Sequence, residues 1–498
     1  MSKRCVIIGS GLGGLSCGVI LSRNGYDVTV LEQGAQPGGC LQAFSRAGAR
    51  FETGMHFLGS CDRGQVLHRL LRYLGVLDRI TLSRLDPRGY DVISLGGERF
   101  AMANGRESFI AGLAERFPGE RDNLRRYFEL VEKVAGASSL HNLRHADRDT
   151  ATLATEYQLR SIDDVLDRVI ADELLRNVLV GSMPLYAAER GKTPFATHAF
   201  ITNFYNRSAF RVAGGSDSIA RALVAEIESA GGRVECNRRA TKIECDAHRA
   251  TAVLAGDTRY EADIVIAAIH PARMLELCDS PLLRPVYRRR VASMPMTTGC
   301  FTVYIKFKPG AMPYMNRNFY GYRGRSPWGC ELYTLEEWPK GYLYMHYCDG
   351  EASGYATSGQ VLSYMNYADV ARWSGSRVGR RGNDYEDFKR AHAERLIAEV
   401  EREHPGFVAS IERYWTSTPL TYRDYTGSEG GSMYGIARDI NLGPAARIHH
   451  RTRVPNLLLA GQNVNSHGIL GVLVGTIVTC SELLTSETIF NQIMETEK

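Results

Sequence analysis

A chain of 498 residues is too long for one hydrophobic core, so its length predicts about two or three folding units. With 44% hydrophobic and 23% charged residues, the composition is ordinary for a globular protein and argues against extensive disorder. The formal net charge of +5 is small for this length and no nucleic-acid-binding module accompanies it, so no nucleic-acid partner is expected.

The N-terminal segment carries the strongest signal. Residues Arg4–Ile8 are rich in β-branched side chains, which predicts a buried parallel strand. Gly9-Ser10-Gly11-Leu12-Gly13-Gly14 follows as an intact G-x-G-x-x-G turn, and an apolar helix is predicted over Leu12–Arg23, ending at Asn24-Gly25. A second strand is predicted over Asp27–Leu31, with an acidic residue directly after it. This order of elements is that of a dinucleotide-binding fold.

Each residue of the turn has a physical task. Gly9 permits the tight bend, Gly11 lets backbone N–H groups approach a pyrophosphate, and Gly14 lets helix and strand pack closely. The helix N-terminus then presents unpaired N–H groups and the positive end of its dipole to the anion. Glu32 is placed to accept hydrogen bonds from a ribose and disfavours a 2′-phosphate, so FAD or NAD is expected rather than NADP.

A second glycine pair decides between these two cofactors. Gln36-Pro37-Gly38-Gly39 forms another glycine-rich turn just past the acid, followed by the sequence RAGARFETGMHFLG. A domain that binds only NAD has no use for this second turn. A flavoprotein that holds FAD in an extended form does, because the loop wraps the ribityl and pyrophosphate region. The sequence therefore predicts FAD.

The next stretch is predicted to leave the nucleotide-binding fold. A helix is expected over Gly64–Leu77, and the alternation that follows Arg84 predicts a hairpin around Gly96-Gly97. Two further helices are predicted, over Ser108–Leu130 with an interruption at Pro118-Gly119, and over Thr155–Val180.

The nucleotide-binding fold is predicted to return near Arg211. A helix over Ser216–Ser229 stops at Gly231-Gly232, and strands follow through Val234 and around Lys242–Cys245. The apolar run Ile264–Ile269 then predicts a buried strand whose carboxyl end faces the ligand crevice.

A second segment outside the nucleotide-binding fold is predicted from about Ala272 to Ala437. TTGCFTVYIKFKPG and GYLYMHYCDG alternate like strands of a half-exposed antiparallel sheet, and Tyr385–Glu403 reads as an amphipathic helix. Much of the tyrosine lies in this region. Two interpretations stay open: these aromatic side chains line an apolar substrate cavity, or they are ordinary strand packing.

The C-terminal stretch predicts a second cofactor turn. Leu457–Ala460 is expected to be a short buried strand, Gly461 a turn, and the segment Gly468–Gly471 the start of a helix. Glycines before a helix let backbone N–H groups point at an acceptor, and a flavin needs a donor at its N1–C2=O edge.

Other features limit the classes of site and partner. The 11 cysteines include no CxxC pair and no metal-like spacing, so no metal site is expected, and with no targeting segment before the first strand they predict reduced thiols in a cytoplasm. No run of about 18 apolar residues is present, so no transmembrane helix is expected. The basic cluster Arg284, Arg288, Arg289 and Arg290 is either a solvated helix face or a peripheral contact with the inner face of a membrane.

The chain resembles the phytoene desaturase superfamily of FAD-dependent oxidoreductases, and within it the retinol saturase and carotenoid isomerase branch. The resemblance spans nearly the whole chain and rests on GSGLGG with Glu32, PGGCLQAF, FETGMHFLG, TPFATHAFITNFYNRSAFRVAGG, TPLTYRDYTGSEGGSMYG and AGQNVNSHGILGV. Two departures stand out. Cys40 replaces the arginine that follows the Gly-Gly pair in amine oxidases and many desaturases, and Ala213 replaces a proline before the central Gly-Gly.

The resemblance implies an α/β protein. Its Rossmann-type FAD-binding domain would be assembled from residues 1–83, 208–271 and 438–498, and its α+β substrate-binding domain, an antiparallel sheet with helices, would be inserted twice, as 84–207 and 272–437. The residues it implies around FAD are Gly9, Gly11, Leu12, Gly13, Gly14, Glu32, Gln33, Gly38, Gly39, Ala240, Gly461, Gln462, Gly468, Gly471 and Val472.

The implied chemistry is a redox reaction at a carbon–carbon bond of a lipophilic polyene, a carotenoid- or retinoid-like molecule. FAD carries the electrons while the protein positions the substrate. Saturation, desaturation and redox-neutral isomerisation all remain open. So does the electron partner, because no second nucleotide-binding fold is predicted. A saturase needs a proton donor, and His56, His467 and Tyr434 are the candidate catalytic residues.

Two other function classes are retained. An amine oxidase or protoporphyrinogen oxidase type of flavoprotein would attack C–N bonds or reduced tetrapyrroles, although Cys40 argues against it. A prenyl-lipid carrier of the GDP-dissociation-inhibitor type would not be an enzyme, but such carriers usually have a degraded nucleotide motif, which is intact in this chain.

Overall fold

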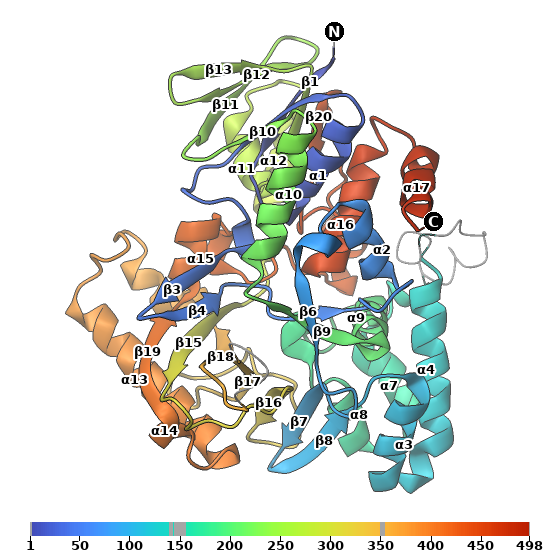
Figure 1. Ribbon diagram of the computed structural model, residues 1–498, viewed down its shortest axis with the longest axis vertical. Helices are drawn as coiled ribbons and strands as arrows, with labels where there is room; N and C mark the ends of the chain where they lie inside the picture. The colour runs from blue at the N-terminus through green and yellow to red at the C-terminus, as the bar shows by residue number, and fades with distance from the viewer. Residues whose placement is uncertain (1, 139–142, 144–155, 349–353, 498) are drawn as a thin grey trace.

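The computed structural model describes residues 2–138, 143, 156–348 and 354–497. At one end of the molecule lies a parallel sheet of 5 strands in the order β10-β2-β1-β14-β20 (Figure 1). Its strands are β1 (Arg4–Ile8), β2 (Asp27–Leu31), β10 (Arg233–Glu235), β14 (Ile264–Ala267) and β20 (Leu457–Leu459). Three separated stretches of the chain therefore build one sheet, and the predicted Rossmann-type α/β fold is confirmed.

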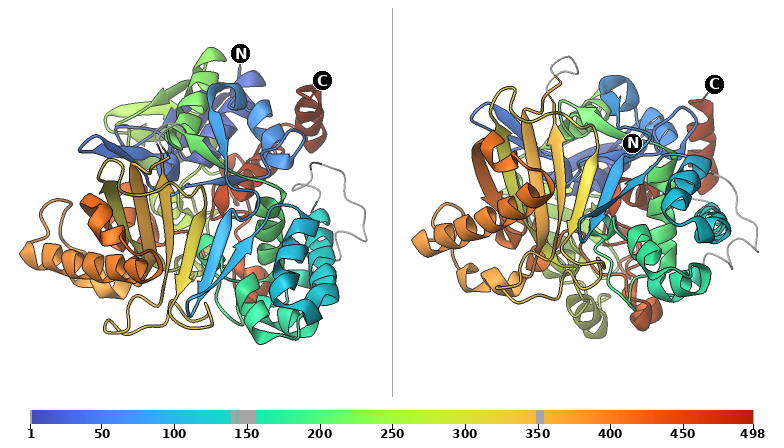
Figure 2. Two further views of the ribbon diagram at one scale, coloured as in Figure 1. Left: turned by 60° about the horizontal axis from the view of Figure 1, so that its bottom comes forward. Right: turned by 90° about the horizontal axis from the view of Figure 1, so that it is seen from below.

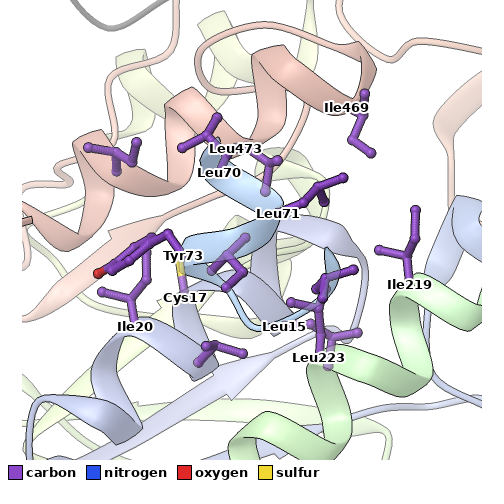
Figure 3. Packing of buried hydrophobic residues seen from close by; sticks show 14 of the residues in the cluster. Leu15, Cys17, Ile20, Leu70, Leu71, Tyr73, Ile219, Leu223, Ile469 and Leu473 are labelled. Atoms are coloured by element: carbon purple, nitrogen blue, oxygen red, sulfur yellow. The ribbon is translucent and has the colours of Figure 1, made fainter. Parts of the chain in front are cut away.

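Four helices cover one face of this sheet and form a continuous core (Figure 3). They are α1 (Leu12–Arg23), α2 (Val66–Tyr73), α10 (Asp217–Ser229) and α16 (Gly468–Cys480). Leu15 and Ile20 of α1 lie among the apolar side chains of the other three helices. The helix predicted over Leu12–Arg23 is confirmed at both ends, and Gly25, with φ +81°, follows it as the left-handed residue that such a helix end favours.

The other face of the parallel sheet packs against α11 (Pro271–Leu277), α12 (Pro285–Ala292) and a small sheet. That small sheet consists of β11 (Ala240–Cys245), β12 (Ala250–Ala255) and β13 (Thr258–Glu261). The strand predicted around Lys242–Cys245 thus exists but lies outside the parallel sheet. The domain boundaries given above remain predictions.

The predicted hairpin around Gly96-Gly97 is confirmed. It joins β7 (Asp91–Leu95) to β8 (Glu98–Met102), and both glycines have positive φ angles, 59° and 88°. A two-residue turn with both φ angles positive matches the twist of antiparallel strands, and glycine adopts that conformation at least cost.

The two long helices predicted after the hairpin are each divided. The first consists of α3 (Arg106–Arg116) and α4 (Arg121–Gly136), with the break at Pro118 as predicted. The second prediction, a single helix over 155–180, is wrong. Within its described part the chain forms α7 (Ile162–Val169) and α8 (Glu173–Leu179), because the Asp172 side chain accepts from the Leu175 N–H and starts a new helix. Residue 155 lies outside the described residues.

The second part of the molecule is built on a sheet of 7 strands in the order β19-β15-β18-β17-β16-β7-β8. Its further strands are β15 (Gly299–Phe307), β16 (Asn318–Tyr322), β17 (Gly341–Tyr347), β18 (Ser358–Met365) and β19 (Ile411–Ser417). All neighbours are antiparallel except β16 and β7, which run parallel.

The prediction that the strands of TTGCFTVYIKFKPG and GYLYMHYCDG are half-exposed is wrong, because β15 and β17 are buried on both faces. Figure 2 shows α13 (Asn383–Glu403), in orange, on one side of this sheet and the cyan helices α3 and α4 on the other. Helices distant in sequence cover both faces, so the alternation of side chains separates two apolar cores rather than core and solvent.

Further strands and helices complete the two parts and the region between them. They are β3 (Ala43–Arg46), β4 (Ala49–Glu52), β5 (Leu58–Gly59), β6 (Thr81–Arg84), β9 (Ala209–Ala213), α9 (Phe195–Arg207), α14 (Phe407–Ser410), α15 (Pro419–Thr426) and α17 (Ser486–Glu495). Across the described ranges, no helix is long and apolar enough to cross a membrane. In the same ranges, no group of three or more His, Cys, Asp or Glu side chains is arranged to hold a metal ion.

Candidate active site

The glycines of the first turn are required by close backbone contacts. Gly9 has a φ of +99°, and a Cβ atom there would lie 2.8 Å from the Ala268 carbonyl oxygen at the end of β14. A Cβ atom at Gly14 would lie 2.0 Å from the Gly9 carbonyl oxygen. Any larger residue would push α1 away from β1 and β14 and would widen the turn.

Three glycine-rich turns from different parts of the chain meet here. The Gly38 N–H donates to the Ser10 carbonyl over 2.9 Å, and a Cβ atom at Gly39 would lie 3.1 Å from the Gly11 Cα. A Cβ atom at Gly13 would lie 2.9 Å from the Gly461 Cα and 3.4 Å from Val472 Cγ1. The structure thus brings together most of the residues that the sequence assigned to the cofactor.

Glu32 lies at the end of β2 and is half-buried. Its carboxylate accepts from the Ser10 N–H over 3.1 Å and from the Gly34 N–H over 2.7 Å, so it is fixed at the edge of the first turn. Arg238 donates its N–H to the Glu32 carbonyl over 2.7 Å, which brings the segment leading into Ala240 to the same edge. Gln33, by contrast, is exposed.

The arrangement fits a dinucleotide. Open space lies beside Gly11 and Gly461, since a Cβ atom at either would have no heavy atom within 4 Å. The helices α1 and α16 both begin at these turns without a side-chain cap, so their first N–H groups are available to an anionic acceptor. Gly468, with φ +73°, and Gly471, which packs against Ser466, form the start of α16, while Gln462 is half-buried in the turn before it. The individual cofactor contacts remain predictions.

His56 lies in a buried polar cluster at the junction of the two parts of the molecule. Its Nδ1 is 3.4 Å from the Tyr347 hydroxyl and 3.6 Å from Glu52 Oε2, and the side chains of His56 and Glu52 are only 12% and 8% exposed. The other Glu52 oxygen, Oε1, accepts from the Ser216 N–H over 3.0 Å. Burial raises the pKa of Tyr347 and the Glu52 charge raises it further, so the phenol stays protonated and available as a donor.

The buried side chain of Arg211 contacts two members of this cluster, His56 and Tyr347. Arg211 Nη1 donates to the His56 carbonyl over 3.3 Å, and its guanidinium carbon lies 4.8 Å from the centre of the Tyr347 ring. Arg211 Nη2 donates to Asn318 Oδ1 over 2.7 Å, and Asn318 Nδ2 donates to Asp91 Oδ1 over 2.8 Å. Among the described residues neither Arg211 nor Asp91 makes a direct ion pair. Burial raises the pKa of Asp91 to about 7, against the opposing effects of Asn318 and Arg211.

His467 lies in a very different place. Its ring packs on Tyr434, with centroids 4.7 Å apart, and its Nε2 is buried without a hydrogen bond to any residue that the structure describes. Burial, with the nearby Arg438 charge, lowers the pKa of His467 to about 3. The Tyr434 hydroxyl donates to the Pro184 carbonyl over 2.9 Å. Two of the three candidate catalytic residues, His467 and Tyr434, are therefore in contact, whereas no hydrogen bond or ring contact among the described residues joins them to His56.

Three buried tyrosines of the tyrosine-rich region 272–437 fit the interpretation of ordinary strand packing. Tyr322, Tyr364 and Tyr434 all donate their hydroxyls to backbone carbonyls of residues 181–184, which is ordinary satisfied packing. Tyr90 and Tyr205 line an internal cavity, but they lie outside that region and leave the substrate-cavity interpretation open.

Sequence reasoning missed Glu52, Tyr347, Arg211, Asn318 and Asp91. Three of them lie inside stretches quoted above, which were usable signals: Glu52 in FETGMHFLG, Arg211 in TPFATHAFITNFYNRSAFRVAGG and Tyr347 in GYLYMHYCDG. The others come from strands whose partners are set by long-range pairing.

Comparisons with known proteins agree with this geometry. The sequence profile of the family described as flavin containing amine oxidoreductase matches residues 12–476. The chain is 27% identical to an all-trans-retinol 13,14-reductase of Rattus norvegicus, over 96% of this chain and 85% of the relative. It is 26% identical to a neurosporene-forming phytoene desaturase of Cereibacter sphaeroides, over 95% of this chain and 93% of the relative. Among solved structures, an oxidoreductase from Methanosarcina mazei superimposes with a TM-score of 0.64 at 15% identity, covering 96% of this chain and 100% of its own.

Proposed function

Because the chain belongs to the family of flavin containing amine oxidoreductases, we propose that it is an FAD-dependent oxidoreductase acting on a carbon–carbon bond of a lipophilic polyene. The observation that carries this proposal is the buried cluster of Glu52, His56 and Tyr347. This cluster supplies a group that can hold a proton at the point where the loops of the cofactor site meet the 7-stranded sheet. Similarity to a retinol reductase and to a phytoene desaturase supports a polyene as the substrate.

The residues that would hold FAD are those of the three glycine turns. Gly9, Gly11 and Gly14 at the start of α1 suit the pyrophosphate, Glu32 suits the ribose, and the N-terminus of α16 suits the flavin edge. When bound, FAD supplies or accepts the hydride at the reacting carbon.

The protein's own task is then to move a proton. His56 Nδ1 is the atom that would hold it, with the Glu52 carboxylate stabilising a protonated imidazole and the Tyr347 hydroxyl orienting the ring. Arg211 fixes the backbone at His56 and the ring of Tyr347. The apolar cores on both faces of the 7-stranded sheet keep water away from the neighbourhood of the site.

Saturation is the direction that the retinol reductase relatives favour, while desaturation and isomerisation use the same cluster. Saturation delivers a hydride to one carbon and a proton to its neighbour. Desaturation removes both, and in that direction His56 would accept the proton.

An anaerobic spectroscopic experiment tests the substrate class. The FAD-loaded protein would be reduced with dithionite and mixed with all-trans-retinol, phytoene and lycopene isomers in turn. We expect the absorption of oxidised flavin to return as a double bond of one polyene is lost. If the polyene changes isomer while the flavin stays reduced, the activity is isomerisation. If no polyene reacts, and amines instead bleach the oxidised protein, the polyene proposal is wrong and an amine oxidase is indicated.

We further propose that the protein takes its substrate up at a membrane surface by peripheral contact. The side chains of Arg284 and Arg289 flank Val286, which is 68% exposed, at the start of α12, so basic and apolar groups share one exposed site. Arg288 of the predicted basic cluster is not part of this surface, because it donates to backbone carbonyls around α11. Co-sedimentation with phosphatidylcholine vesicles, with and without phosphatidylserine, tests the contact. Binding to the anionic vesicles should be lost in the double variant Arg284→Gln, Arg289→Gln. The cytoplasmic location remains a prediction.

A further inference from the structure

A small cavity lies between the β7–β8 hairpin and the helices α3, α8 and α9. Its volume is about 20 Å³. Most of its lining is apolar, from Ile93, Met102, Phe109, Val178 and Ile201 among others. A space of this size accommodates one water-sized group and is too small for a ring. Whatever enters it is therefore the end of a chain or a single solvent molecule.

One charged side chain lines this apolar cavity. Asp91 is only 2% exposed, and the hydroxyl-bearing residues Ser182 and Thr202 lie in the same lining. A carboxyl in an apolar wall is costly unless something donates hydrogen bonds to it. The fully buried Tyr320 phenol lies close enough to this carboxyl to lower its pKa as a donor, although the contact does not meet ordinary hydrogen-bond geometry.

The orientation of the carboxyl is fixed by its neighbours. Arg211 can only donate, so Asn318 must turn its Oδ1 toward the guanidinium and its Nδ2 toward Asp91. Asp91 Oδ1 is therefore a hydrogen-bond acceptor held in place by a rigid amide. The group leaves accepting capacity in an apolar recess, which is the arrangement that recognises a donor at the end of a hydrophobic ligand.

The cavity also lies near the candidate catalytic cluster, to which packed side chains link its lining. Tyr205 lines it, and the Tyr205 ring packs on Phe57, the residue directly after His56, with ring centroids 4.7 Å apart. On the opposite side of Asp91, the path through Asn318 and Arg211 reaches the His56 carbonyl. Asp91 thus lies at the far end of a short series of contacts that begins at His56.

We infer that Asp91 forms a subsite for the terminal hydroxyl of the substrate, so that the protein selects a polyene alcohol over a polyene hydrocarbon. The inference rests on the proposed function and narrows its substrate class. The hydroxyl fills the cavity and donates to the Asp91 carboxyl. No covalent step is involved. A polyene without a polar end would place a methyl group against the carboxyl and leave it without that donor.

A binding experiment on the FAD-loaded full-length protein tests the subsite. The probes are all-trans-retinol, its deoxy hydrocarbon analogue ending in a methyl group, and the corresponding amine, titrated against oxidised protein. Because leaving a buried carboxyl without a donor is costly, we expect the wild type to bind the alcohol about tenfold more tightly than the hydrocarbon. In Asp91→Leu the ratio should fall to about one.

Two further variants keep the test decisive. Asp91→Asn preserves the shape and the bond from Asn318, so it should fold even if Asp91→Leu does not, and it should lower the preference for the alcohol several-fold. Ser94→Ala is the matched control. Ser94 is a buried polar residue on the same strand, but it faces the other way and donates to Glu403 over 2.9 Å, so its loss should leave the ratio unchanged.

The outcomes separate the subsite from the proposed function. If the wild type binds alcohol and hydrocarbon equally, the cavity holds only a water molecule and the subsite is refuted while the polyene proposal stands. If the amine binds most tightly and loses that advantage in Asp91→Asn, the subsite recognises an ammonium group and the hydroxyl assignment is wrong. If none of the polyenes binds, both proposals fail.

Discussion

The two histidines beside the cofactor turns occupy opposite environments. His56 has a carboxylate and a phenol within 3.6 Å of one ring nitrogen, together with an arginine on its backbone. His467 has an aromatic ring against its face, an arginine charge nearby, and a buried Nε2 that no described residue satisfies. Both side chains are largely buried, so burial does not distinguish them.

The difference shows how neighbours decide what a histidine can do. A carboxylate beside an imidazole favours the protonated form, whereas burial beside a cation favours the neutral form. With its pKa lowered to about 3, His467 is neutral at physiological pH and is a poor proton donor. We therefore assign proton handling to His56 and expect His467 to support the wall of the site together with Tyr434.

Replacing each histidine in turn is the strongest challenge to this contrast. His56→Phe removes the group that would carry the proton, so turnover should fall by about 10²- to 10⁴-fold. His467→Phe should change turnover by less than about threefold, because a phenylalanine preserves the aromatic packing on Tyr434. Steady-state assays on protein with the wild-type FAD content measure both effects. A larger loss in His467→Phe than in His56→Phe would reverse the assignment.

Removing only the negative charge of Glu52 beside His56 tests what distinguishes His56 from His467. Glu52→Gln retains an oxygen to accept from the Ser216 N–H but no longer stabilises a protonated imidazole. We expect turnover to fall by about tenfold. Unchanged turnover in a folded, FAD-containing variant would remove Glu52 from the mechanism.

Loss of the arginine behind the cluster should have a smaller effect. Arg211→Gln removes the donor to the His56 carbonyl and the cation against the Tyr347 ring, so we expect roughly a tenfold loss or less through poorer positioning. Arg211→Lys should restore part of the activity because it keeps the charge.

Arg84→Gln is the matched control for that variant. Arg84 lies on β6, paired with the strand that carries Arg211, but its side chain is 41% exposed and pairs with Asp62 at the surface. Turnover should stay within about twofold of wild type, because exposed ion pairs contribute little. An equal loss in the two arginine variants would mean that the effect comes from the sheet and not from the position of His56.

The last expected effect concerns stability in acid rather than turnover. The pKa of His467 is lowered in the folded state, so the unfolded chain binds more protons below its own pKa of about 6.5, and stability is lost as pH falls through that value. Between pH 7 and pH 5 the wild type should lose roughly 2 kcal/mol more than His467→Phe. Denaturant unfolding of both proteins at the two pH values measures the difference. An identical loss in both would show that His467 is not desolvated in solution.

The two parts of the chain differed in how far the sequence could predict them. β1, α1 and β2 follow from local patterns: a β-branched run, a glycine turn, and an apolar helix that stops at Asn24-Gly25. Every one of those signals acts within a few residues, so the boundaries could be predicted closely. The convergence of Gly13 with Gly461 followed from the repetition of the same kind of turn at both ends of the chain.

The 7-stranded sheet depends on contacts between residues far apart in the sequence, which no local pattern contains. Asp91 meets Asn318 across a sequence separation of 227 residues, through parallel strands β7 and β16. The alternation in β15 and β17 predicted the strands correctly, but not which distant helices cover their second face. His56 was predicted as a candidate from its motif, whereas Tyr347 and Arg211 became recognisable only once three sheets were placed together.

The most direct test of the account is an anaerobic single turnover with product analysis. Pre-reduced wild type, His56→Phe and His467→Phe would each be mixed with all-trans-retinol, and the flavin absorption and the product mass would be followed. We expect wild type and His467→Phe to reoxidise their flavin while the polyene gains two hydrogen atoms, and His56→Phe to react far more slowly. Flavin that stays reduced in the wild type while the polyene is unchanged, or equal rates in all three proteins, would contradict it.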